Sequence, residues 1–325
     1  MKRKIIIDTD PGIDDAYAII AALQNPDLEV LGITCVCGNK GLDTTVTNAL
    51  RLTQLLKKEI LVYEGAVTNL CSLRSNKIDP IDADKVHGSD GLGNTNLPYD
   101  KHNLSTQSAI DFIIETIAKY PNEIEILALG PLTNLALCIE ENEEIMKKTK
   151  AIYSMGGGIN RGNITPYAEF NYYYDELATS LVFKKLQEFV NIYMIGLDAT
   201  HGTRVDHNDL AFMMYEDDHI GKLIHDITQV YGKLYYKNYG YLGAVIHDVI
   251  AYLYMIEPQI AVDVIKDVYI DVKTDQMHRG QTVIDNDRQA KSNVVMNCDR
   301  DLVSKLTIKA LLPDKYGRYL EVIAI

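Results

Sequence analysis

Short runs of aliphatic residues recur along the chain and predict the strands of a buried sheet. The runs are continuous rather than alternating, which is typical of parallel strands covered by helices on both faces. We expect strands at Lys4–Ile7, Val30–Val36, Ile60–Tyr63, Ile124–Leu129, Ile152–Met155 and Asn191–Ile195. Between these runs, the spacing of apolar positions predicts helices over Asp14–Gln24, Thr44–Lys58 and Ser105–Lys119. This order predicts an α/β fold whose sheet is open, mostly parallel and doubly wound.

Two longer segments do not follow this alternation. Residues Asn69–Asn103 are rich in Gly, Asn, Asp and Ser with little periodicity, which predicts a long functional loop. Residues His207–Ile256 are helical in pattern and rich in tyrosine, so we expect a helical layer over the carboxyl edge of the strands. Because no linker, repeat or low-complexity tract interrupts the chain, residues 1–325 are expected to form a single domain.

Composition and charge exclude several classes of function. The 325 residues carry 45 acidic and 32 basic side chains, a net charge of −13, so the chain lacks the positive field by which proteins hold nucleic acid or anionic lipid. The longest apolar runs, Ala16–Leu23 and Val249–Ile256, fall far short of the ~18 residues that span a membrane. Five scattered cysteines form neither a disulfide framework nor a zinc motif. We expect a cytoplasmic protein that binds neither nucleic acid nor membranes.

The strongest local signal is a group of four carboxylates directly after the first predicted strand. Residues Asp8–Asp15 read Asp-Thr-Asp-Pro-Gly-Ile-Asp-Asp and lead into a helix. Asp14 and Asp15 could simply stabilise the helix N-terminus, where the helix dipole favours anions. No Lys or Arg lies between Lys4 and Lys40 to neutralise the group, and clustered like charges disfavour joint ionisation. We therefore favour a bound cation, and all-oxygen ligands select Ca²⁺ or Mg²⁺.

Other polar or glycine-rich turns follow the predicted strands at the same edge of the sheet. Asn39 follows the second strand, Gly130–Asn134 follows the fourth and Gly156–Gly158 follows the fifth. Open α/β sheets bind ligands beyond the carboxyl ends of their strands, so these turns are expected to surround a ligand. Taken alone, each of these residue patterns more often serves only to form a turn than to form a binding site. Neither nucleotide fingerprint, GxGxxG or GxxxxGKS/T, occurs in the chain.

Six stretches, in order along the chain, resemble the signature motifs of the inosine-uridine nucleoside hydrolase family. They are Asp8–Ala16, His87–Gly93, Leu129–Asn134, Met155–Gly158, Ala168–Asn171 and His247–Asp248. The resemblance runs from about Asp8 to Asp248 and leaves the stretch after Pro258 without distinctive motifs. It implies an open, mostly parallel α/β sheet with a calcium ion at the carboxyl edge, in agreement with the fold expected from the pattern.

The resemblance also implies the residues of the site. A Ca²⁺ ion would be held by Asp10, Asp15, the backbone carbonyl of Leu129 and Asp248. The ribose hydroxyls would be held by Asp14, Asn163, Glu169 and Asn171, with Asn39 as a further site residue and Met155 and Phe170 lining the sugar pocket. The implied partner is therefore a small ribonucleoside.

The implied activity is hydrolysis of the N-glycosidic bond of ribonucleosides such as inosine and uridine, giving free base and ribose. In this reaction a metal-bound water attacks the sugar, and Asp10 would act as its general base. His247 matches the histidine that protonates the leaving base, a role that suits an imidazole near neutral pH. A histidine in an apolar helix is otherwise more often a core residue. The adjacent Asp248 favours the site, because a buried unpaired carboxylate would be costly away from a metal.

One further histidine and three tyrosines are expected to contact the nucleobase. His87 lies in a Gly-rich loop where the family places a base-contacting histidine, and an exposed loop histidine is the alternative. Tyr231, Tyr235 and Tyr239 recur every four residues, so on one helix they share a face. Core packing usually explains such a stripe. By resemblance, however, the three tyrosines fall where family members contact the base, and aromatic rings stack on bases with little regard to base identity.

Two other functions are alternatives. Asp8 and Asp10 after a hydrophobic strand also resemble the nucleophile and acid of haloacid dehalogenase-type phosphatases, but Gly12 departs from that pattern. A non-catalytic nucleoside-binding protein of the same fold is the second alternative. Family members are commonly dimers or tetramers, so the resemblance implies a homo-oligomer, such as a homotetramer.

Overall fold

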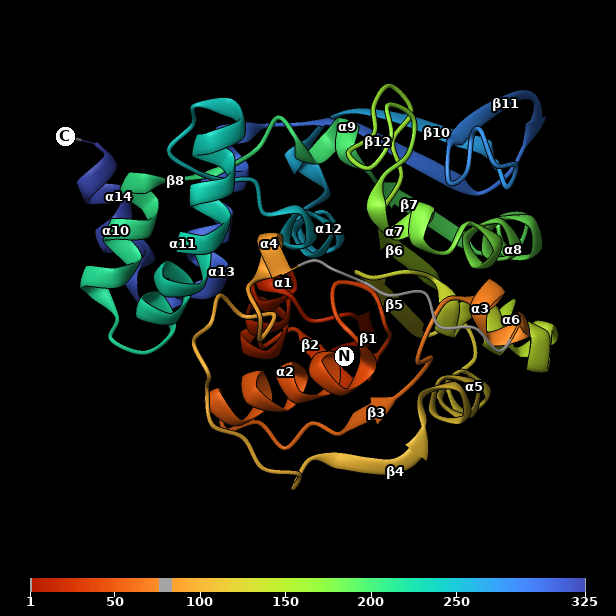
Figure 1. The fold of residues 1–325 in the computed structure, drawn as a ribbon, viewed down its shortest axis with the longest axis horizontal. Helices are drawn as coiled ribbons and strands as arrows, with labels where there is room; N and C mark the ends of the chain where they lie inside the picture. The colour runs from red at the N-terminus through yellow and green to blue at the C-terminus, as the bar shows by residue number, and fades with distance from the viewer. Residues whose placement is uncertain (1, 76–83, 325) are drawn as a thin grey trace.

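In the computed structural model, which describes residues 2–75 and 84–324, strands from most of the chain form one ten-stranded sheet (Figure 1). Its strand order is β11-β10-β12-β7-β6-β5-β1-β2-β3-β4. These strands are β1 (Arg3–Thr9), β2 (Leu28–Cys35), β3 (Val62–Glu64), β4 (Leu104–Ser108), β5 (Ile124–Ala128), β6 (Ala151–Met155), β7 (Asn191–Ile195), β10 (Ala261–Val272), β11 (Thr282–Gln289) and β12 (Ser292–Cys298). Two short strands, β8 (Val205–Asp206) and β9 (Gly243–Ala244), pair separately.

The helices cover the sheet and extend beyond one edge of it (Figure 1). They are α1 (Ile13–Gln24), α2 (Leu42–Leu55), α3 (Leu70–Ser75), α4 (Asp84–His87), α5 (Ala109–Lys119), α6 (Thr133–Met146), α7 (Phe170–Tyr174), α8 (Glu176–Leu186), α9 (Leu197–Thr200), α10 (His207–Glu216), α11 (Ile220–Tyr239), α12 (His247–Ile256), α13 (Arg300–Leu311) and α14 (Tyr316–Ile323). None of those within residues 2–75 and 84–324 combines the length and the hydropathy that a bilayer span requires.

The direction in which the chain crosses the sheet reverses between β1 and β5. From β1 the chain proceeds outward through β2, β3 and β4, all parallel, and then returns to β5, β6 and β7 on the other side of β1. The expected open, mostly parallel, doubly wound sheet is therefore confirmed. Such a reversal leaves a crevice at the carboxyl ends of the two central strands, which is where sheets of this kind bind ligands.

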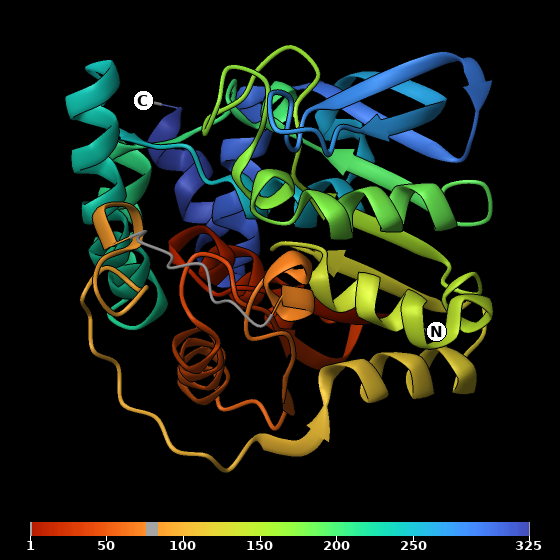
Figure 2. The ribbon, with the colours of Figure 1, turned by 45° about the vertical axis from the view of Figure 1, so that its right-hand side comes forward.

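Two hydrophobic cores lie on opposite faces of the sheet. Along β1, Ile5 and Ile7 belong to one core and Ile6 to the other, because successive side chains of a strand point to opposite faces. The first core contains side chains of α1, α2, α12 and α13, and the second contains those of α5, α6 and α8. Figure 2 shows α5, α6 and α8 side by side on their face. Burial on both faces explains why the strand runs are continuously apolar.

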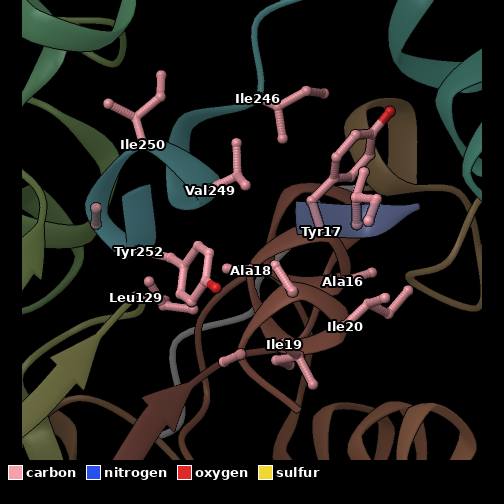
Figure 3. Close-up of a cluster of buried hydrophobic side chains, with 14 of the residues drawn as sticks. Ala16, Tyr17, Ala18, Ile19, Ile20, Leu129, Ile246, Val249, Ile250 and Tyr252 are labelled. Atoms are coloured by element: carbon pink, nitrogen blue, oxygen red, sulfur yellow. The ribbon is translucent and has the colours of Figure 1, made fainter. Parts of the chain in front are cut away.

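Helix α1 is buried on nearly every side, as its sequence predicts. Figure 3 shows its small and branched side chains against α12, where Ala18 and Ile19 share a cluster with Val249 and Ile250. Small residues allow this close approach, and α1 and α12 are among the most extensively contacting helix pairs. The packing fixes the two helix N-termini that carry the acidic residues of the site.

Element boundaries differ from the sequence prediction at the fourth strand. The helix expected from Ser105 begins at Ala109, because Leu104–Ser108 pair with β3 as the edge strand β4. The Ser108 side chain accepts a hydrogen bond from the backbone N–H of Asp111 and starts α5. A polar sequence can form this strand because an edge position buries little of it.

Other ends shift by a few residues, and one loop prediction was incomplete. The helix expected at Thr44–Lys58 is α2, which spans Leu42–Leu55. The segment Asn69–Asn103, expected as a loop, contains the short helices α3 and α4, and its residues 76–83 lie outside the described part. The stretch after Pro258, which carried no motif, adds β10, β11 and β12 to the sheet, with β10 antiparallel to both neighbours.

A buried glutamate at the amino end of the central strands pairs with two partly exposed basic side chains. Glu125 of β5 is 1% exposed and accepts from Arg3 of β1 at 2.5 Å and from Lys150 at 2.9 Å. Burial acts to raise the pKa of Glu125, but the bonds from Arg3 and Lys150 outweigh it and hold that pKa below its usual range. We expect Glu125→Gln to lower the free energy of unfolding at pH 7 by about 1–3 kcal/mol, measured by urea denaturation.

The depressed pKa of Glu125 also determines how the stability difference between wild type and Glu125→Gln changes with pH. A carboxyl whose folded pKa is depressed stabilises the fold above its unfolded pKa of ~4.3, and the stabilisation is lost as the pH falls through the lower, folded pKa. The difference between wild type and Glu125→Gln should therefore shrink below about pH 4. Glu123→Gln is the matched control, because Glu123 pairs with Lys4 at the surface, where its side chain is 53% exposed. An equal loss in both variants would contradict the assignment.

Candidate active site

A cavity of about 320 Å³ opens at the carboxyl ends of β1 and β5, at the reversal of the sheet order. The residues predicted to bind substrate all line it: Asp14, Asn39, His87, Met155, Asn163, Glu169, Phe170, Asn171, Tyr231, Tyr235 and Tyr239. Leu129, His247 and Asp248 line it as well. The structure thus brings to one place residues from nine separate segments of the chain, and this geometry was expected from strand ends and motifs alone.

Buried carboxylates form the floor of this cavity. Asp14, Asp15 and Asp248 each offer an oxygen within 4.8 Å of the others, and all three are at least nine-tenths buried. Asp14 and Asp15 stand in the first turn of α1, and Asp248 stands in the first turn of α12. The packing of α1 against α12 therefore assembles the group from two helix N-termini.

Asp10, the other predicted ligand, is fully buried directly beside this group. Its Oδ2 accepts from the backbone N–H of Asn39 at 2.6 Å, whereas its Oδ1 has no hydrogen-bond partner within the described residues. The glycines Gly38 and Gly130 pack so closely on the Asp10 carboxylate that a Cβ at either would overlap it. This is the close approach that the glycine-rich turns after β2 and β5 provide.

The pKa values of these acids are shifted upward. Burial, and after it the charge of Asp15, raises the pKa of Asp14 to about 8 and that of Asp10 well above its usual range. Burial and the charges of Asp14 and Asp15 also raise the pKa of Asp248. Carboxylates kept this close and this dry repel one another, and a bound cation is the arrangement that lets them all ionise.

The donors present fit a hard cation. Asp10 Oδ1 and Asp14 Oδ1 are buried without a partner in the described residues, and Asp14, Asp15 and Asp248 each offer a carboxylate oxygen. The predicted fourth ligand, the carbonyl of Leu129, accepts from Asn171 Nδ2 at 2.7 Å, and a carbonyl oxygen has a second lone pair with which to bind an ion. Sequence reasoning placed Asp14 with the ribose, whereas the geometry places it equally among the acids that could hold an ion.

The carboxylate of Glu169 is fixed by backbone groups at the wall of the cavity. Its Oε1 accepts from the N–H of Asn171 and its Oε2 from the N–H groups of Gly157 and Tyr172, so Glu169 caps α7. Burial nevertheless raises its pKa to about 7. The Asn171 amide in turn donates to the carbonyls of Leu129 and Met155. These bonds hold both polar side chains rigidly at the cavity wall.

His247 lines the same cavity and stands at the first position of α12. Its Nδ1 lies 2.7 Å from the Thr200 hydroxyl and its Nε2 lies 3.2 Å from the Tyr235 hydroxyl. Burial, with a smaller effect from the charges of His201 and His87, lowers the pKa of His247 to about 3. The side chain is therefore a neutral, hydrogen-bonded imidazole when no substrate charge is near it.

Comparison with known proteins decides the family. The model of the inosine-uridine preferring nucleoside hydrolase family matches residues 5–305. The chain belongs to this family. It is 36% identical to uridine nucleosidase 1 of Arabidopsis thaliana over 285 residues, which cover 87% of this chain and 82% of that protein. It is 35% identical to the pyrimidine-specific ribonucleoside hydrolase RihB of Escherichia coli (strain K12) over 309 residues, 92% of this chain and 94% of that one.

Solved structures agree with this assignment. The plant nucleoside hydrolase PpNRh1 superposes with a TM-score of 0.89 at 31% sequence identity, over 96% of this chain and 99% of that one. The resemblance stated from the sequence motifs is thus confirmed, and so is the fold class. Together the family and its relatives support ribonucleoside hydrolysis by an N-glycosidase.

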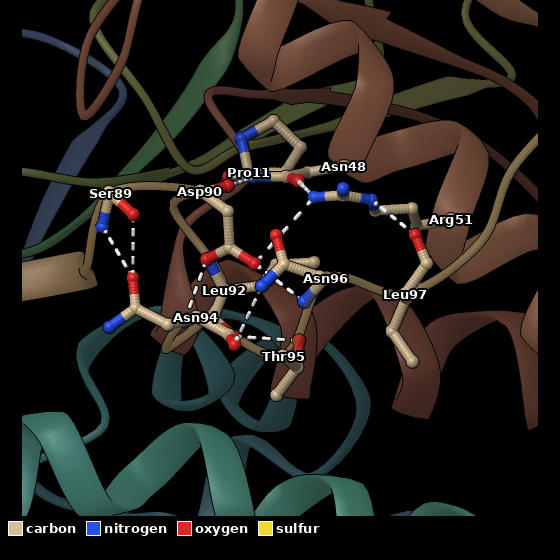
Figure 4. A network of polar contacts seen from close by, with 10 residues as sticks. All are labelled: Pro11, Asn48, Arg51, Ser89, Asp90, Leu92, Asn94, Thr95, Asn96 and Leu97. Carbon is tan, nitrogen blue, oxygen red and sulfur yellow. Dashed lines mark hydrogen bonds and ion pairs between the residues drawn. The ribbon is translucent and has the colours of Figure 1, made fainter.

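In this member of the nucleoside hydrolase family, the Gly-rich motif after α4 is a tightly bonded loop. Asp90 accepts from the backbone N–H groups of Leu92, Asn94 and Asn96, and Asn48 of α2 donates to the Asp90 carbonyl (Figure 4). These bonds tie the loop to α2, and through it they hold His87 at the cavity.

His87 is also hydrogen-bonded to the start of α1. The backbone N–H of Ile13, in the first turn of α1, donates to His87 Nδ1 at 3.1 Å, and burial lowers the pKa of the imidazole to about 3. A neutral ring that accepts at Nδ1 carries its proton on Nε2. His87 is thus a hydrogen-bond donor rather than the exposed loop residue of the alternative interpretation.

The three tyrosines of α11 line one side of the cavity. The rings of Tyr231 and Tyr235 lie 5.8 Å apart and those of Tyr235 and Tyr239 lie 5.7 Å apart. Tyr231 is 5% exposed and Tyr239 is 68% exposed, so the stripe runs from the floor of the cavity to its mouth. Core packing explains the burial of Tyr231 but not the exposed position of Tyr239, which favours contact with a ligand.

Asp8 does not reach the cavity in this family member. It is fully buried on the far side of β1, where Thr34 and Asn134 donate to its Oδ1 at 2.6 Å and 2.8 Å. A phosphatase nucleophile must be open to attack by substrate, so this position argues against the haloacid dehalogenase alternative.

Sequence reasoning missed five residues that line the cavity. They are Val86, Ile164, His201, Leu234 and Asn238. Leu234 and Asn238 lie three residues after Tyr231 and Tyr235, so helical spacing could have indicated them. His201 directly follows α9 at the carboxyl end of β7, a position that strand order could have indicated.

Proposed function

We propose that the protein is a calcium-dependent ribonucleoside hydrolase that converts uridine, inosine and related nucleosides to free base and ribose. The observation that carries the proposal is one cavity lined both by Asp14, which has a buried, unpaired carboxylate oxygen, and by His247, which has a hydrogen-bonded imidazole. The relatives named for uridine and pyrimidine nucleosides support uridine as a substrate hydrolysed at least as well as inosine.

The cation belongs among the buried carboxylates. Asp10, Asp15, Asp248 and the carbonyl of Leu129 would hold it, with Asp14 beside them. When bound, Ca²⁺ offsets the repulsion among these acids and lowers the pKa of water beside it.

The side chains of the protein carry the rest of the reaction. Asp10 has a carboxylate oxygen without a partner in the described residues, so this oxygen can accept the proton of the attacking water as a general base. Asp14, Glu169 and Asn171 place oxygens where positive charge develops on the ribose ring, and these contacts strengthen in the transition state.

His247 assists the departing base. A base leaving with negative charge favours protonation of an adjacent imidazole, which raises the pKa of His247 from its low resting value. His247 can then deliver a proton from Nε2, the atom that Tyr235 contacts. Tyr231, Tyr235, Tyr239 and His87 would stack on or bond to the base, with little demand on its identity.

A reducing-sugar assay with uridine, cytidine, inosine and adenosine tests the proposal. We expect ribose to be released in the presence of Ca²⁺, without phosphate, and release to be lost on chelation and restored by added Ca²⁺. Phosphate release from a nucleotide would instead support the phosphatase alternative. Tight binding of nucleosides without turnover would support the non-catalytic one.

We also propose that residues 1–325 act as a single domain, that the protein is a cytoplasmic homo-oligomer, dimer or tetramer, and that it binds neither nucleic acid nor membranes. Exposed apolar side chains in α11 and directly after it support association, since Tyr236 is 60% and Leu242 is 63% exposed.

A further inference from the structure

Thr200 makes the shortest side-chain contact to His247, although it does not line the cavity and belongs to none of the recognised motifs. Its hydroxyl lies 2.7 Å from His247 Nδ1, and it is fully buried. Thr200 ends α9, the short helix that follows β7, whereas His247 begins α12. The contact therefore joins two elements that are far apart in the sequence.

We propose that Thr200 is a positioning residue that holds the His247 imidazole so that its Nε2 points at the nucleobase. The inference rests on the proposed function, because it concerns how the leaving base is assisted. Thr200 itself touches neither substrate nor reacting atoms.

The chemistry of the hydroxyl suits this task. Imidazole can rotate about its bond to Cβ, and it can carry its proton on either nitrogen. A hydroxyl both donates and accepts, so Thr200 can stay bonded to Nδ1 whether or not that nitrogen carries hydrogen. The ring is thus held in one orientation whichever of its nitrogens carries the proton. A carboxylate at this position could only accept, and a methyl group could do neither.

Neighbouring residues fix the position of Thr200 in turn, and they leave the His247 ring little room to rotate. The backbone N–H of Thr200 donates to Gly196 at 3.1 Å, and the Thr203 hydroxyl donates to the Thr200 carbonyl at 2.8 Å. The neighbouring His201 ring packs edge-on against His247, with the centroids 5.5 Å apart and the planes at 75°. A rotated ring would lose the bond to Thr200 and the bond to Tyr235 together.

The test compares Thr200→Val, which removes the hydroxyl at nearly constant volume, with Thr200→Ser, which keeps it. Each variant is measured with uridine, whose base needs a proton to leave, and with p-nitrophenyl riboside, whose leaving group departs as a stable anion. We expect Thr200→Val to lower kcat for uridine by roughly 10–100-fold with KM changed by less than about threefold. With p-nitrophenyl riboside the change should stay within about threefold, and Thr200→Ser should resemble wild type on both substrates.

Two further variants separate positioning from loss of folding. Thr307→Val is the matched control, because Thr307 is equally buried and bonded but lies in α13, away from the cavity. In a His247→Ala background, Thr200→Val should cause no additional loss with uridine, since its effect passes through the imidazole. If Thr200→Val proves too unstable to assay, Thr200→Ala takes its place in the same comparison.

Equal losses on both substrates, failure of Thr200→Ser to restore activity, or additive losses in the double variant would each overturn the inference. In those cases the wild type still releases ribose, and the proposed function stands. Failure of the wild type to release ribose from any nucleoside would overturn the proposed function, and this inference with it.

Discussion

Asp10→Asn should lower kcat for uridine by roughly 10²–10⁴-fold while the chain stays folded. The substitution is nearly isosteric, and the amide oxygen can still accept from the Asn39 N–H as Asp10 Oδ2 does. What is lost is the unpartnered oxygen of a carboxylate that can take a proton from water. Steady-state kinetics by ribose release, together with circular dichroism, measure both parts of the expectation.

Asp8→Asn is the matched control for this result. Asp8 is equally buried and lies two residues earlier, but its carboxylate faces Thr34 and Asn134 instead of the cavity. We expect this variant to keep its activity within about tenfold of wild type. The reverse pattern, with Asp8→Asn inactive and Asp10→Asn active, would contradict the assignment of Asp10 as the general base and would favour the phosphatase alternative.

Asp248→Asn is expected to have opposite effects on stability with and without calcium. It removes one of several buried like charges, so without metal the melting temperature should rise by roughly 2–4 °C. Saturating Ca²⁺ should raise the melting temperature of wild type, because binding at about 100 times Kd stabilises by about 2.7 kcal/mol. That rise should nearly vanish in the variant, and ribose release should fall in parallel.

Asp175→Asn provides the comparison for a buried carboxylate outside the site. Asp175 is 1% exposed, but backbone N–H groups and the Thr133 hydroxyl satisfy its oxygens. Its replacement should lower stability and leave the response to Ca²⁺ unchanged. A metal response of normal size in Asp248→Asn, measured by calorimetric titration, would place the ion elsewhere.

The strands of the central sheet could be predicted because burial on both faces demands continuous apolar runs. Ile5–Ile7 meets that demand and Ile124–Ala128 does so except at Glu125, and both strands are predicted within a residue or two. The edge strand β4 could not be found this way, because its sequence Leu-Ser-Thr-Gln-Ser is mostly polar and half exposed. The same holds for the exposed start of β10, whose antiparallel pairing needs no apolar run.

The residues of the site likewise divide into those that could be predicted from the sequence and those that could not. Residues within motifs or at strand ends, such as Asn39 and Glu169, could be placed from the sequence because the ends of parallel strands converge. Thr200 could not, since its importance depends on α9 meeting the first turn of α12. Contacts between such distant elements are set by packing, which no local pattern records.

The packing of α1 against α12 has a consequence for biosynthesis. Asp15 and Asp248 meet in the folded chain but are roughly 230 residues apart in sequence, so a ribosome adding about 5–20 residues per second delivers the second some 10–50 s after the first. During that interval the acids after β1 have no partner from α12. If the proposed site holds the cation, a nascent chain truncated before α12 should not respond to calcium, whereas a chain that includes α12 should.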